Sequence, residues 1–282
     1  MLVNRETLCL PRGRLLMMLL VISLAATGWG GRCSDTAPES IGLVWEDEFE
    51  GPAGQSPSES RWRFDIGTGW GNAQLEWDTD QPDNVSLDGN GNLAITAIKE
   101  SFEGCEYTSG RINTMGLFSH DYGRFEARIK LPVGQGIWPA FWLLGADFGD
   151  VGWPSCGEID ILEYKGQEPS VVQGAVHGPG YSGGGAIWRK YTLTGSEGFN
   201  AGFHVFALEW SPNEITWLVD DIPYFTVTPG DLPTGERWVF NHPFFIILNV
   251  AVGGHFVGPP DATTSFPQTM LIDYVRVYEG GF

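Results

Sequence analysis

The sequence predicts an all-β protein, built as a two-sheet antiparallel β-sandwich. Three observations favour this fold class: apolar residues alternate with period two, turn residues separate the alternating segments, and no long segment carries a helical apolar stripe. The 39 glycines and 18 prolines are consistent with many turns between short strands. No internal repeat emerges, which argues against a propeller or a solenoid.

Four segments carry the strand prediction. The glycine-rich loop at 87–93 separates the segment NVS from LAITAI and indicates a tight hairpin. Residues 124–131 alternate apolar and charged side chains, as a half-buried strand does. Residues 214–221 place apolar side chains on one face, and their Asp-Asp pair predicts a turn into IPYFTV. Residues 244–250 are apolar throughout, which is typical of a strand covered on both faces.

The N-terminal segment differs from the rest of the chain. Residues 1–26 are predicted to be a signal peptide, because three arginines precede a short apolar run that ends in small residues. Residues 27–40 lack periodicity and predict a flexible lead, and residues 41–282 predict a single domain. We therefore expect a secreted or periplasmic protein with no membrane span. A lipoprotein anchor at Cys33 is the alternative, which the preceding Arg32 disfavours.

The net charge and the cysteines limit the classes of binding partner and cofactor that the sequence favours. The net charge of −19 disfavours nucleic acids and anionic membranes, since binding to phosphates depends on Lys and Arg, whereas a neutral polymer is compatible with it. Cys105 and Cys156 lie in the predicted domain, and an exported protein can oxidise them if the fold brings them together, so the disulfide is left open. No zinc or redox motif is present in the sequence, and we expect a monomer.

The segment CGEIDILEY places three carboxylates among apolar residues. A helix would scatter them around its axis, whereas a strand puts Glu158 and Asp160 on one face. A β-bulge near Ile161 and Leu162 would bring Glu163 onto the same face. The two glutamates could then approach the roughly 5–5.5 Å separation of a retaining glycosidase. An exposed acidic strand or a cation site is the alternative for such a triplet.

Three stretches of the chain resemble glycoside hydrolase family 16: GEIDILEY, residues 107–145 and residues 247–279. The resemblance extends over 41–282, and the Glu-x-Asp-x-x-Glu spacing is similar to the laminarinase branch. It implies a β-jelly roll with a cleft on its concave sheet, and a retaining endo-β-1,3-glucanase that hydrolyses laminarin-like β-1,3-glucans without a catalytic cofactor. A mixed-linkage β-1,3-1,4-glucanase is the alternative enzyme. A non-catalytic β-1,3-glucan-binding protein is disfavoured, because such proteins usually lose the glutamates.

The resemblance also implies a role for each carboxylate. Glu158 matches the nucleophile, which forms a covalent glycosyl-enzyme. Glu163 matches the acid/base, which must hold a proton near neutral pH. Asp160 lies between them, where it can hydrogen-bond the nucleophile and keep Glu163 protonated by like-charge repulsion.

Six further residues are expected to bind substrate. The resemblance favours three tryptophans as sugar platforms and three polar residues as cleft-lining groups: Trp138, Trp142, Trp153, Asn72, Arg111 and His177. Each also has a structural reading, namely core packing for the tryptophans, a turn for the asparagine, a salt bridge for the arginine and packing for the histidine. His255 and Phe256 depart from the family pattern, which has Asn and Trp there, so the reach of the binding subsites stays open.

A structural calcium ion on the convex face is the remaining implication of the resemblance. The candidate ligands are Glu48, the carbonyl oxygen of Gly91, and Asp273, and hard oxygen ligands are those that Ca²⁺ prefers. The alternative is that the two carboxylates pair with basic neighbours.

Overall fold

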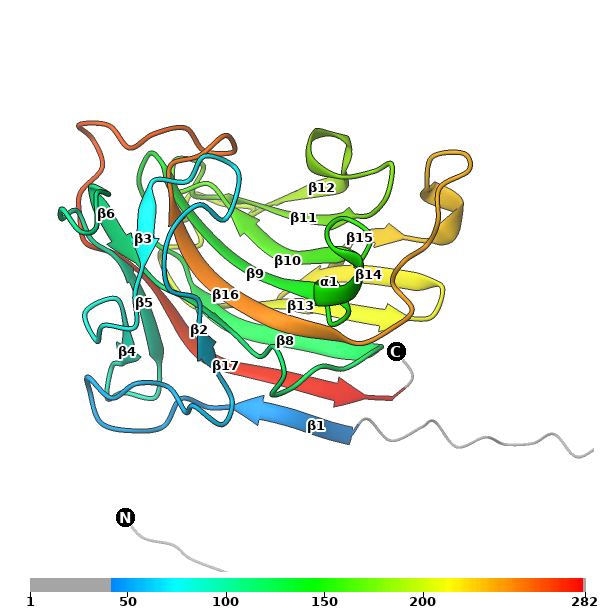
Figure 1. Cartoon of the computed structure of the whole chain (residues 1–282), viewed down its shortest axis with the longest axis horizontal. Helices are drawn as coiled ribbons and strands as arrows, with labels where there is room; N and C mark the ends of the chain where they lie inside the picture. Colours follow the sequence, from blue (N-terminus) through cyan, green and yellow to red (C-terminus); the bar gives the residue numbers. More distant parts are fainter. Residues whose placement is uncertain (1–41, 281–282) are drawn as a thin grey trace, which may run out of the picture. The chain divides into compact units, whose positions relative to one another are not determined.

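Two antiparallel sheets contain most of the strands in the computed structural model, which describes residues 42–280 (Figure 1). The all-β prediction is confirmed, since the helical elements of this range are short: α1 (Phe148–Val151), η1 (Gly183–Gly185) and η2 (Pro229–Asp231). None of the helices between residues 42 and 280 has the length and apolarity needed to cross a bilayer. The predicted signal peptide, flexible lead and Cys33 lie outside the described residues.

The first sheet has eight strands. In spatial order they are β15 (Ile222–Val227), β14 (Glu214–Val219), β13 (His204–Ser211), β8 (Gly123–Lys130), β17 (Gln268–Glu279), β5 (Leu93–Ala97) and β4 (Val85–Leu87), with β1 (Gly42–Asp47) also paired to β17. The second sheet has seven strands. Their order is β12 (Ile187–Thr192), β11 (Val171–His177), β10 (Glu158–Tyr164), β9 (Ile137–Gly145), β16 (Phe244–Val252), β7 (Arg111–Asn113) and β2 (Arg63–Phe64). A short parallel pair joins β3 (Glu76–Asp78) to β6 (Tyr107–Ser109).

The strands predicted from periodicity are present. The segment 124–131 corresponds to β8, and 244–250 lies within β16, whose residues are all buried. The Asp-Asp pair forms the turn between β14 and β15, and both aspartates adopt positive φ there. Gly89 and Gly91 in the β4–β5 hairpin have φ values of 80° and 82°, which a side chain would disfavour.

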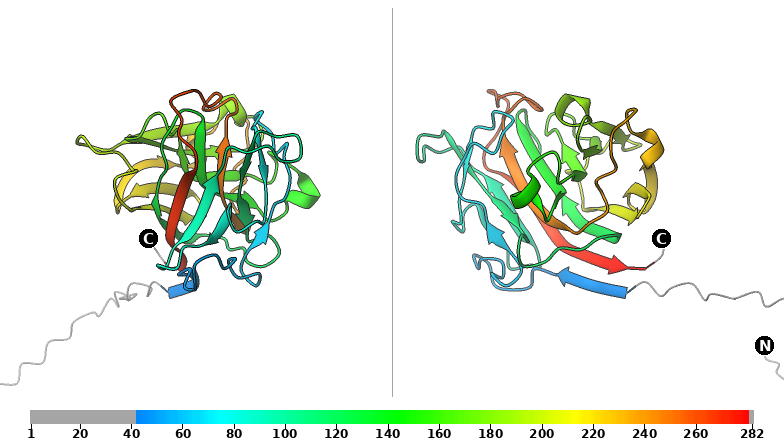
Figure 2. Two further views of the ribbon diagram at one scale, coloured as in Figure 1. Left: turned by 90° about the vertical axis from the view of Figure 1, so that its left-hand side faces the viewer. Right: turned by 45° about the vertical axis from the view of Figure 1, so that its right-hand side comes forward.

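The apolar core lies between the two sheets, whose layered arrangement is visible in Figure 2. Phe125 of β8 and Leu208 of β13 come from the eight-stranded sheet, and Ile159 of β10 and Ile246 of β16 come from the seven-stranded sheet. Each such side chain contributes about 1.5–3 kcal/mol when it is fully buried. The strands of the seven-stranded sheet are therefore held in place by the core side chains on their inner face.

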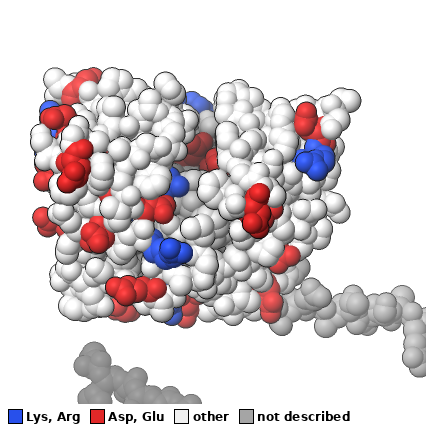
Figure 3. Space-filling model, viewed as in Figure 1, with Lys and Arg blue, Asp and Glu red and all other residues white. Residues whose placement is uncertain are grey.

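The other face of the seven-stranded sheet carries the polar residues. Directly opposed residues of an antiparallel pair share a face, so the register of β10 with β9 and β11 places Trp142, Asp160 and Ala175 in one row. A second row contains Ala140, Glu163 and Gln173. We call this outer face the cleft face. The space-filling view shows a hollow with acidic side chains inside it (Figure 3).

Cys105 and Cys156 are free thiols in the structure, so the disulfide that the sequence left open is not formed. Cys156 is buried, and burial raises the pKa of its thiol to about 11. Such a thiol stays protonated at neutral pH and behaves as a small apolar residue.

Candidate active site

The bulge in β10 is present where the motif predicts it. Asp160 and Glu163 are three residues apart on β10, whereas their partners on β11, Ala175 and Gln173, are two residues apart. One residue of β10 is therefore extra. Ile161 and Leu162 both contribute to the core cluster, and Glu163 returns to the cleft face opposite Gln173. The three carboxylates of β10 are therefore on one face of the strand.

Glu158 is held by two side chains at the N-terminal end of β10. The indole Nε1–H of Trp153 donates a hydrogen bond of 2.8 Å to its Oε2 atom, and His177 Nε2 lies 3.6 Å from its Oε1 atom. Burial raises the pKa of Glu158 to about 8, and the neighbouring Asp160 adds to this shift. The hydrogen bond from Trp153 and the histidine both favour the ionised form of Glu158.

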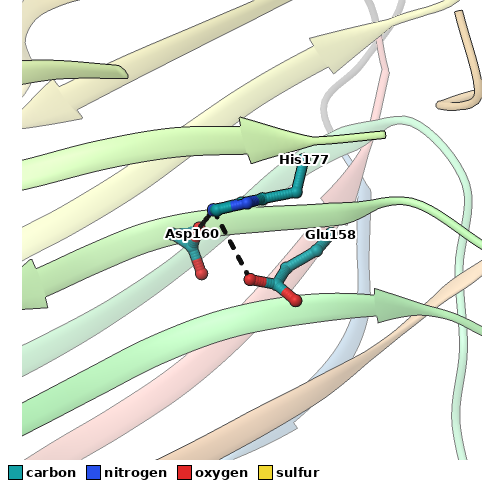
Figure 4. A group of neighbouring side chains, drawn as sticks. All are labelled: Glu158, Asp160 and His177. Atoms are coloured by element: carbon teal, nitrogen blue, oxygen red, sulfur yellow. Dashed lines mark ion pairs between the residues drawn. The ribbon is translucent and has the colours of Figure 1, made fainter. Parts of the chain in front are cut away.

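His177 connects Glu158 to Asp160 (Figure 4). Its Nε2 atom lies 3.0 Å from Asp160 Oδ2, and its Nδ1 atom accepts a 3.0 Å hydrogen bond from the backbone N–H of Gly183. Because Nδ1 is the acceptor, a neutral imidazole must carry its proton on Nε2, the ring nitrogen closest to the two carboxylates. The η1 segment thus fixes the tautomer of a side chain on β11.

Glu163 occupies a different environment from Glu158. Its Oε2 atom accepts a hydrogen bond of 3.4 Å from Gln173 Nε2, a weaker contact than the one that Trp153 makes to Glu158. Burial raises the pKa of Glu163 to about 8, and Asp160 raises it further. Burial likewise raises the pKa of Asp160 to about 8. His177 and an indole N–H oppose the rise in pKa at both glutamates, Trp153 at Glu158 and Trp138 at Glu163, and His177 is the larger of these influences at each. The shorter indole contact, at 2.8 Å, favours Glu158 as the site of negative charge.

Arg111 closes the β7 side of the cleft face between two aromatic rings. Its guanidinium carbon lies 5.0 Å from the ring centroid of Trp70 and 5.0 Å from that of Trp142. Its Nε atom is 2.8 Å from Asp65 Oδ2, so the salt bridge that was the structural alternative is present, and a role of Arg111 in substrate binding stays a prediction. The Trp142 Nε1–H donates a 2.9 Å hydrogen bond to Asn249 Oδ1, which fixes the ring orientation.

Comparison with known proteins agrees with this geometry. The family model described as Glycosyl hydrolases family 16 matches residues 71–276. The chain belongs to this family. It is 40% identical over 274 residues to a protein named Beta-glucanase from Rhodothermus marinus, with 92% of each chain covered.

Solved structures of family 16 enzymes superpose closely on this glycoside hydrolase. The laminarinase catalytic domain from Thermotoga maritima has a TM-score of 0.81 and 47% identity, covering 86% of this chain and 100% of that one. The endo-β-1,3-glucanase from Pyrococcus furiosus has a TM-score of 0.80 and 47% identity, covering 85% and 94%. The predicted family and the jelly-roll fold are confirmed.

The three predicted sugar platforms differ in how much surface this family 16 enzyme exposes. Trp153 is 46% exposed, Trp142 is half-buried, and Trp138 is 8% exposed. The ring of Trp138 lies 4.9 Å from that of Phe256, with Ala251 and Val257 in the same apolar cluster. Trp153 therefore offers an open ring, whereas Trp138 offers little more than an edge.

Asn72 and His255 meet at one end of the hydrolase's cleft face. Asn72 adopts a positive φ of 53°, and its carbonyl oxygen accepts a 2.8 Å hydrogen bond from the backbone N–H of His255. The turn role of Asn72 is thus present, and its role in substrate binding stays a prediction. Phe256, which follows His255, also lies 4.3 Å below the ammonium of Lys165.

Two buried acids were missed by the sequence reasoning. Glu76 and Asp78 on β3 are each 2% exposed, and Asp78 Oδ2 accepts a 2.8 Å hydrogen bond from Trp70 Nε1. Burial raises the pKa of Glu76 to about 7 and raises the pKa of Asp78 well above its ordinary value. Their spacing of two residues in LEWDT was a usable signal, since it puts both on one face of a strand. Through Trp70 and Arg111, they support the β7 side of the site.

The predicted calcium ligands do not fit an ion in this arrangement. Both carboxylate oxygens of Glu48 accept hydrogen bonds from Arg276, at 2.7 and 2.9 Å. Asp273 Oδ2 lies 2.5 Å from Arg128 Nη1. Two of the three proposed ligands are thus already paired with guanidinium groups, and the calcium site stays a prediction without support from these contacts.

A second group of possible metal ligands lies in the site itself. One ligand atom from each of Glu158, Asp160 and His177 lies within 4.8 Å of the others. The residue types suit a divalent cation, but Nε2 of a neutral His177 carries the proton when Nδ1 accepts from Gly183, so it has no free lone pair for an ion. We therefore assign this group to proton and charge control.

Proposed function

We propose that the chain is an endo-β-1,3-glucanase that hydrolyses internal β-1,3-glucosidic bonds of laminarin-like glucans with retention of anomeric configuration. The observation that carries the proposal is the placement of Glu158 and Glu163 on one face of β10, separated by Asp160 and a bulge. The similar laminarinase from Thermotoga maritima and the endo-β-1,3-glucanase from Pyrococcus furiosus support this activity. No cofactor is required by this chemistry.

In the first step, the Glu158 carboxylate attacks the anomeric carbon while Glu163 donates its proton to the leaving glycosidic oxygen. The C–O bond to the leaving sugar breaks as the bond to Glu158 forms, and a covalent glycosyl-enzyme results. The Trp153 Nε1–H orients Glu158 through its 2.8 Å hydrogen bond. The burial of Glu158 keeps water from stabilising its carboxylate before the reaction.

In the second step, the Glu163 carboxylate removes a proton from water, and the resulting oxygen attacks the same anomeric carbon. The bond to Glu158 breaks, and Glu163 regains its proton. When Asp160 is ionised, its charge raises the pKa of Glu163 and helps the acid to keep its proton for the first step. His177 limits this repulsion through its contacts with Asp160 and Glu158, at 3.0 and 3.6 Å.

The test is to follow reducing ends and the anomeric proton signals of the products while the purified protein digests laminarin, with barley mixed-linkage glucan in parallel. We expect rapid cleavage of laminarin with the β anomer released first. Release of the α anomer would refute the retaining mechanism. Activity on barley glucan alone would transfer the assignment to a mixed-linkage β-1,3-1,4-glucanase, and inactivity on both would favour a glucan-binding protein.

We also propose that the chain is exported and acts as a monomer. Export is supported by the arginines and the short apolar run in residues 1–26, and N-terminal sequencing of the mature protein tests the cleavage site. The expected result is a new N-terminus close to residue 27. Light scattering of the purified protein tests the monomer, and a mass of two or more chains would refute it.

A further inference from the structure

Three tryptophans stand out by their exposure among residues 42–280. Trp70, Trp153 and Trp188 are 36%, 46% and 50% exposed, whereas every other described tryptophan is buried or half-buried. Trp70 packs on Arg111, and Trp153 donates to Glu158, so two of the three belong to the candidate active site. The most exposed, Trp188, has no role in the site described so far.

Strand register places Trp188 on the cleft face. Asp160 on β10 is directly opposite Ala175 on β11, and Ala175 is directly opposite Trp188 on β12. Directly opposed residues of antiparallel strands project to the same side, so Trp188 shares its side with Asp160. Adjacent strands are about 4.8 Å apart, which puts the Trp188 backbone about 10 Å from that of Asp160.

The same row extends to the other side of Asp160. Trp142 on β9 is directly opposite Asp160, so one row contains Trp142, Asp160, Ala175 and Trp188 in that order. An aromatic ring thus lies on each side of the acidic strand. Ala175, which lies between Asp160 and Trp188 in this row, is itself buried.

A single hairpin carries both His177 and Trp188. The loop at 178–186 joins β11 to β12, and it is tied down where the buried Tyr181 donates a 2.8 Å hydrogen bond to the carbonyl of Arg237. The same loop supplies the Gly183 N–H that binds His177 Nδ1. The position of Trp188 is therefore fixed relative to the catalytic carboxylates.

We propose that Trp188 is a sugar-binding platform that extends the cleft along β12 and binds glucosyl units of the β-1,3-glucan away from the bond that is cleaved. The inference rests on the proposed function and adds a binding subsite to it. The occupant is a glucan because the residue continues the row of Asp160 across the cleft face.

The surroundings of Trp188 suit a neutral ligand. The next cleft-face residue of β12, Lys190, is paired with Glu168 at 2.9 Å, which neutralises the charge beside the ring. The C–H face of a β-glucosyl unit can cover an indole and remove its apolar surface from water. A charged partner would find little net charge here to bind.

The experiment compares the wild type with Trp188→Ala, Trp188→Phe and the control Ile222→Ala. Ile222 is 54% exposed on β15 of the eight-stranded sheet, so its variant also loses exposed apolar surface, but away from the cleft face. Hydrolysis is measured on laminari-oligosaccharides from the shortest that the wild type cleaves up to the polymer. Binding of long oligosaccharides is measured in a Glu158→Gln background.

We expect Trp188→Ala to raise KM for the long substrates by about 3- to 10-fold, the size of an aromatic contact of roughly 0.7–1.4 kcal/mol, with kcat nearly unchanged. The shortest substrate should be cleaved as by the wild type, Trp188→Phe should retain most of the affinity, and Ile222→Ala should have no effect. An equal loss on short and long substrates, or no loss on any, would overturn the inference. A wild type that is inactive on laminarin would instead refute the proposed function.

Discussion

Two sets of carboxylates in this protein have the same side chains and opposite surroundings. On β10, Glu158, Asp160 and Glu163 are desolvated, and the pKa of each is raised to about 8. Glu48 directly follows β1, and Asp273 lies on β17 of the eight-stranded sheet. Each pairs with an arginine at 2.5–2.9 Å. Glu48 and Asp273 make ion pairs that stabilise the fold, whereas the β10 carboxylates can exchange protons. The groups around a carboxylate, rather than the residue type, therefore decide what it does.

The sharpest test of this comparison is Glu158→Gln. The variant retains the shape of the side chain and loses the nucleophile, so we expect turnover of laminarin to fall by at least about 10³-fold while glucan binding persists. The measurement is reducing-end release together with the affinity for a long laminari-oligosaccharide. Substantial residual hydrolysis would show that Glu158 is not the nucleophile.

Glu163→Gln should have a smaller and substrate-dependent effect. Loss of the general acid is expected to slow laminarin hydrolysis by about 10²–10⁴-fold. An aryl β-glucoside of the same glucan has a leaving group that needs no proton, so the variant should release a burst of aryl alcohol followed by a slow phase. Stopped-flow absorbance checks this. Glu158→Gln serves as the control, because without a nucleophile it should give no burst.

The smallest effect concerns stability. The folded protein raises the pKa of Glu163 from 4.5 to about 8, so the stabilising contribution of its proton is complete below pH 4.5 and is lost as the pH rises through about 8. Glu163→Gln removes this titration. We therefore expect the variant to match the wild type in urea unfolding at pH 4 and to be more stable by roughly 1–3 kcal/mol at pH 8.

Glu48→Gln is the matched control for that measurement. It removes a partly exposed ion pair to Arg276, so it should destabilise the protein by about 1 kcal/mol or less, and less still at high salt. The two substitutions are chemically identical, yet they should change the free energy of unfolding at pH 8 in opposite directions. If Glu163→Gln is less stable than the wild type at pH 8, the distinction between desolvated carboxylates on β10 and arginine-paired carboxylates elsewhere is wrong.

Local patterns in the sequence predicted much of the fold and the centre of the site. The period-two segments predicted β8 and β14, and the continuous apolar run at 244–250 predicted β16. Glu163 is one residue out of step with Glu158 and Asp160, and this predicted the bulge at Ile161 and Leu162. These features depend on neighbours along the chain, so the sequence contains them directly. The fold class was predicted from the same periodicity and from the turn residues, and the roles of the three carboxylates stay predictions that the family resemblance implies.

Features that depend on distant partners were not predictable in this way. Glu48 pairs with Arg276, and Asp273 pairs with Arg128, only after the sheet has formed. The sequence therefore could not exclude the two carboxylates as calcium ligands. Trp188 follows a glycine-rich loop in a segment without a recognisable motif, and its place on the cleft face depends on the register of three strands. The free thiols depend equally on the separation of two distant segments.

The bulge in β10 also sets the spacing between Glu158 and Glu163 along the strand. Because Ile161 is an extra residue that faces the core, deleting it converts Glu-x-Asp-x-x-Glu into Glu-x-Asp-x-Glu and leaves all three carboxylates on the same face. The deletion would move the acid/base about 3.3 Å along the strand without changing any side chain of the triad. A single residue that faces the core thus acts as a spacer between two carboxylates on the opposite face of the strand.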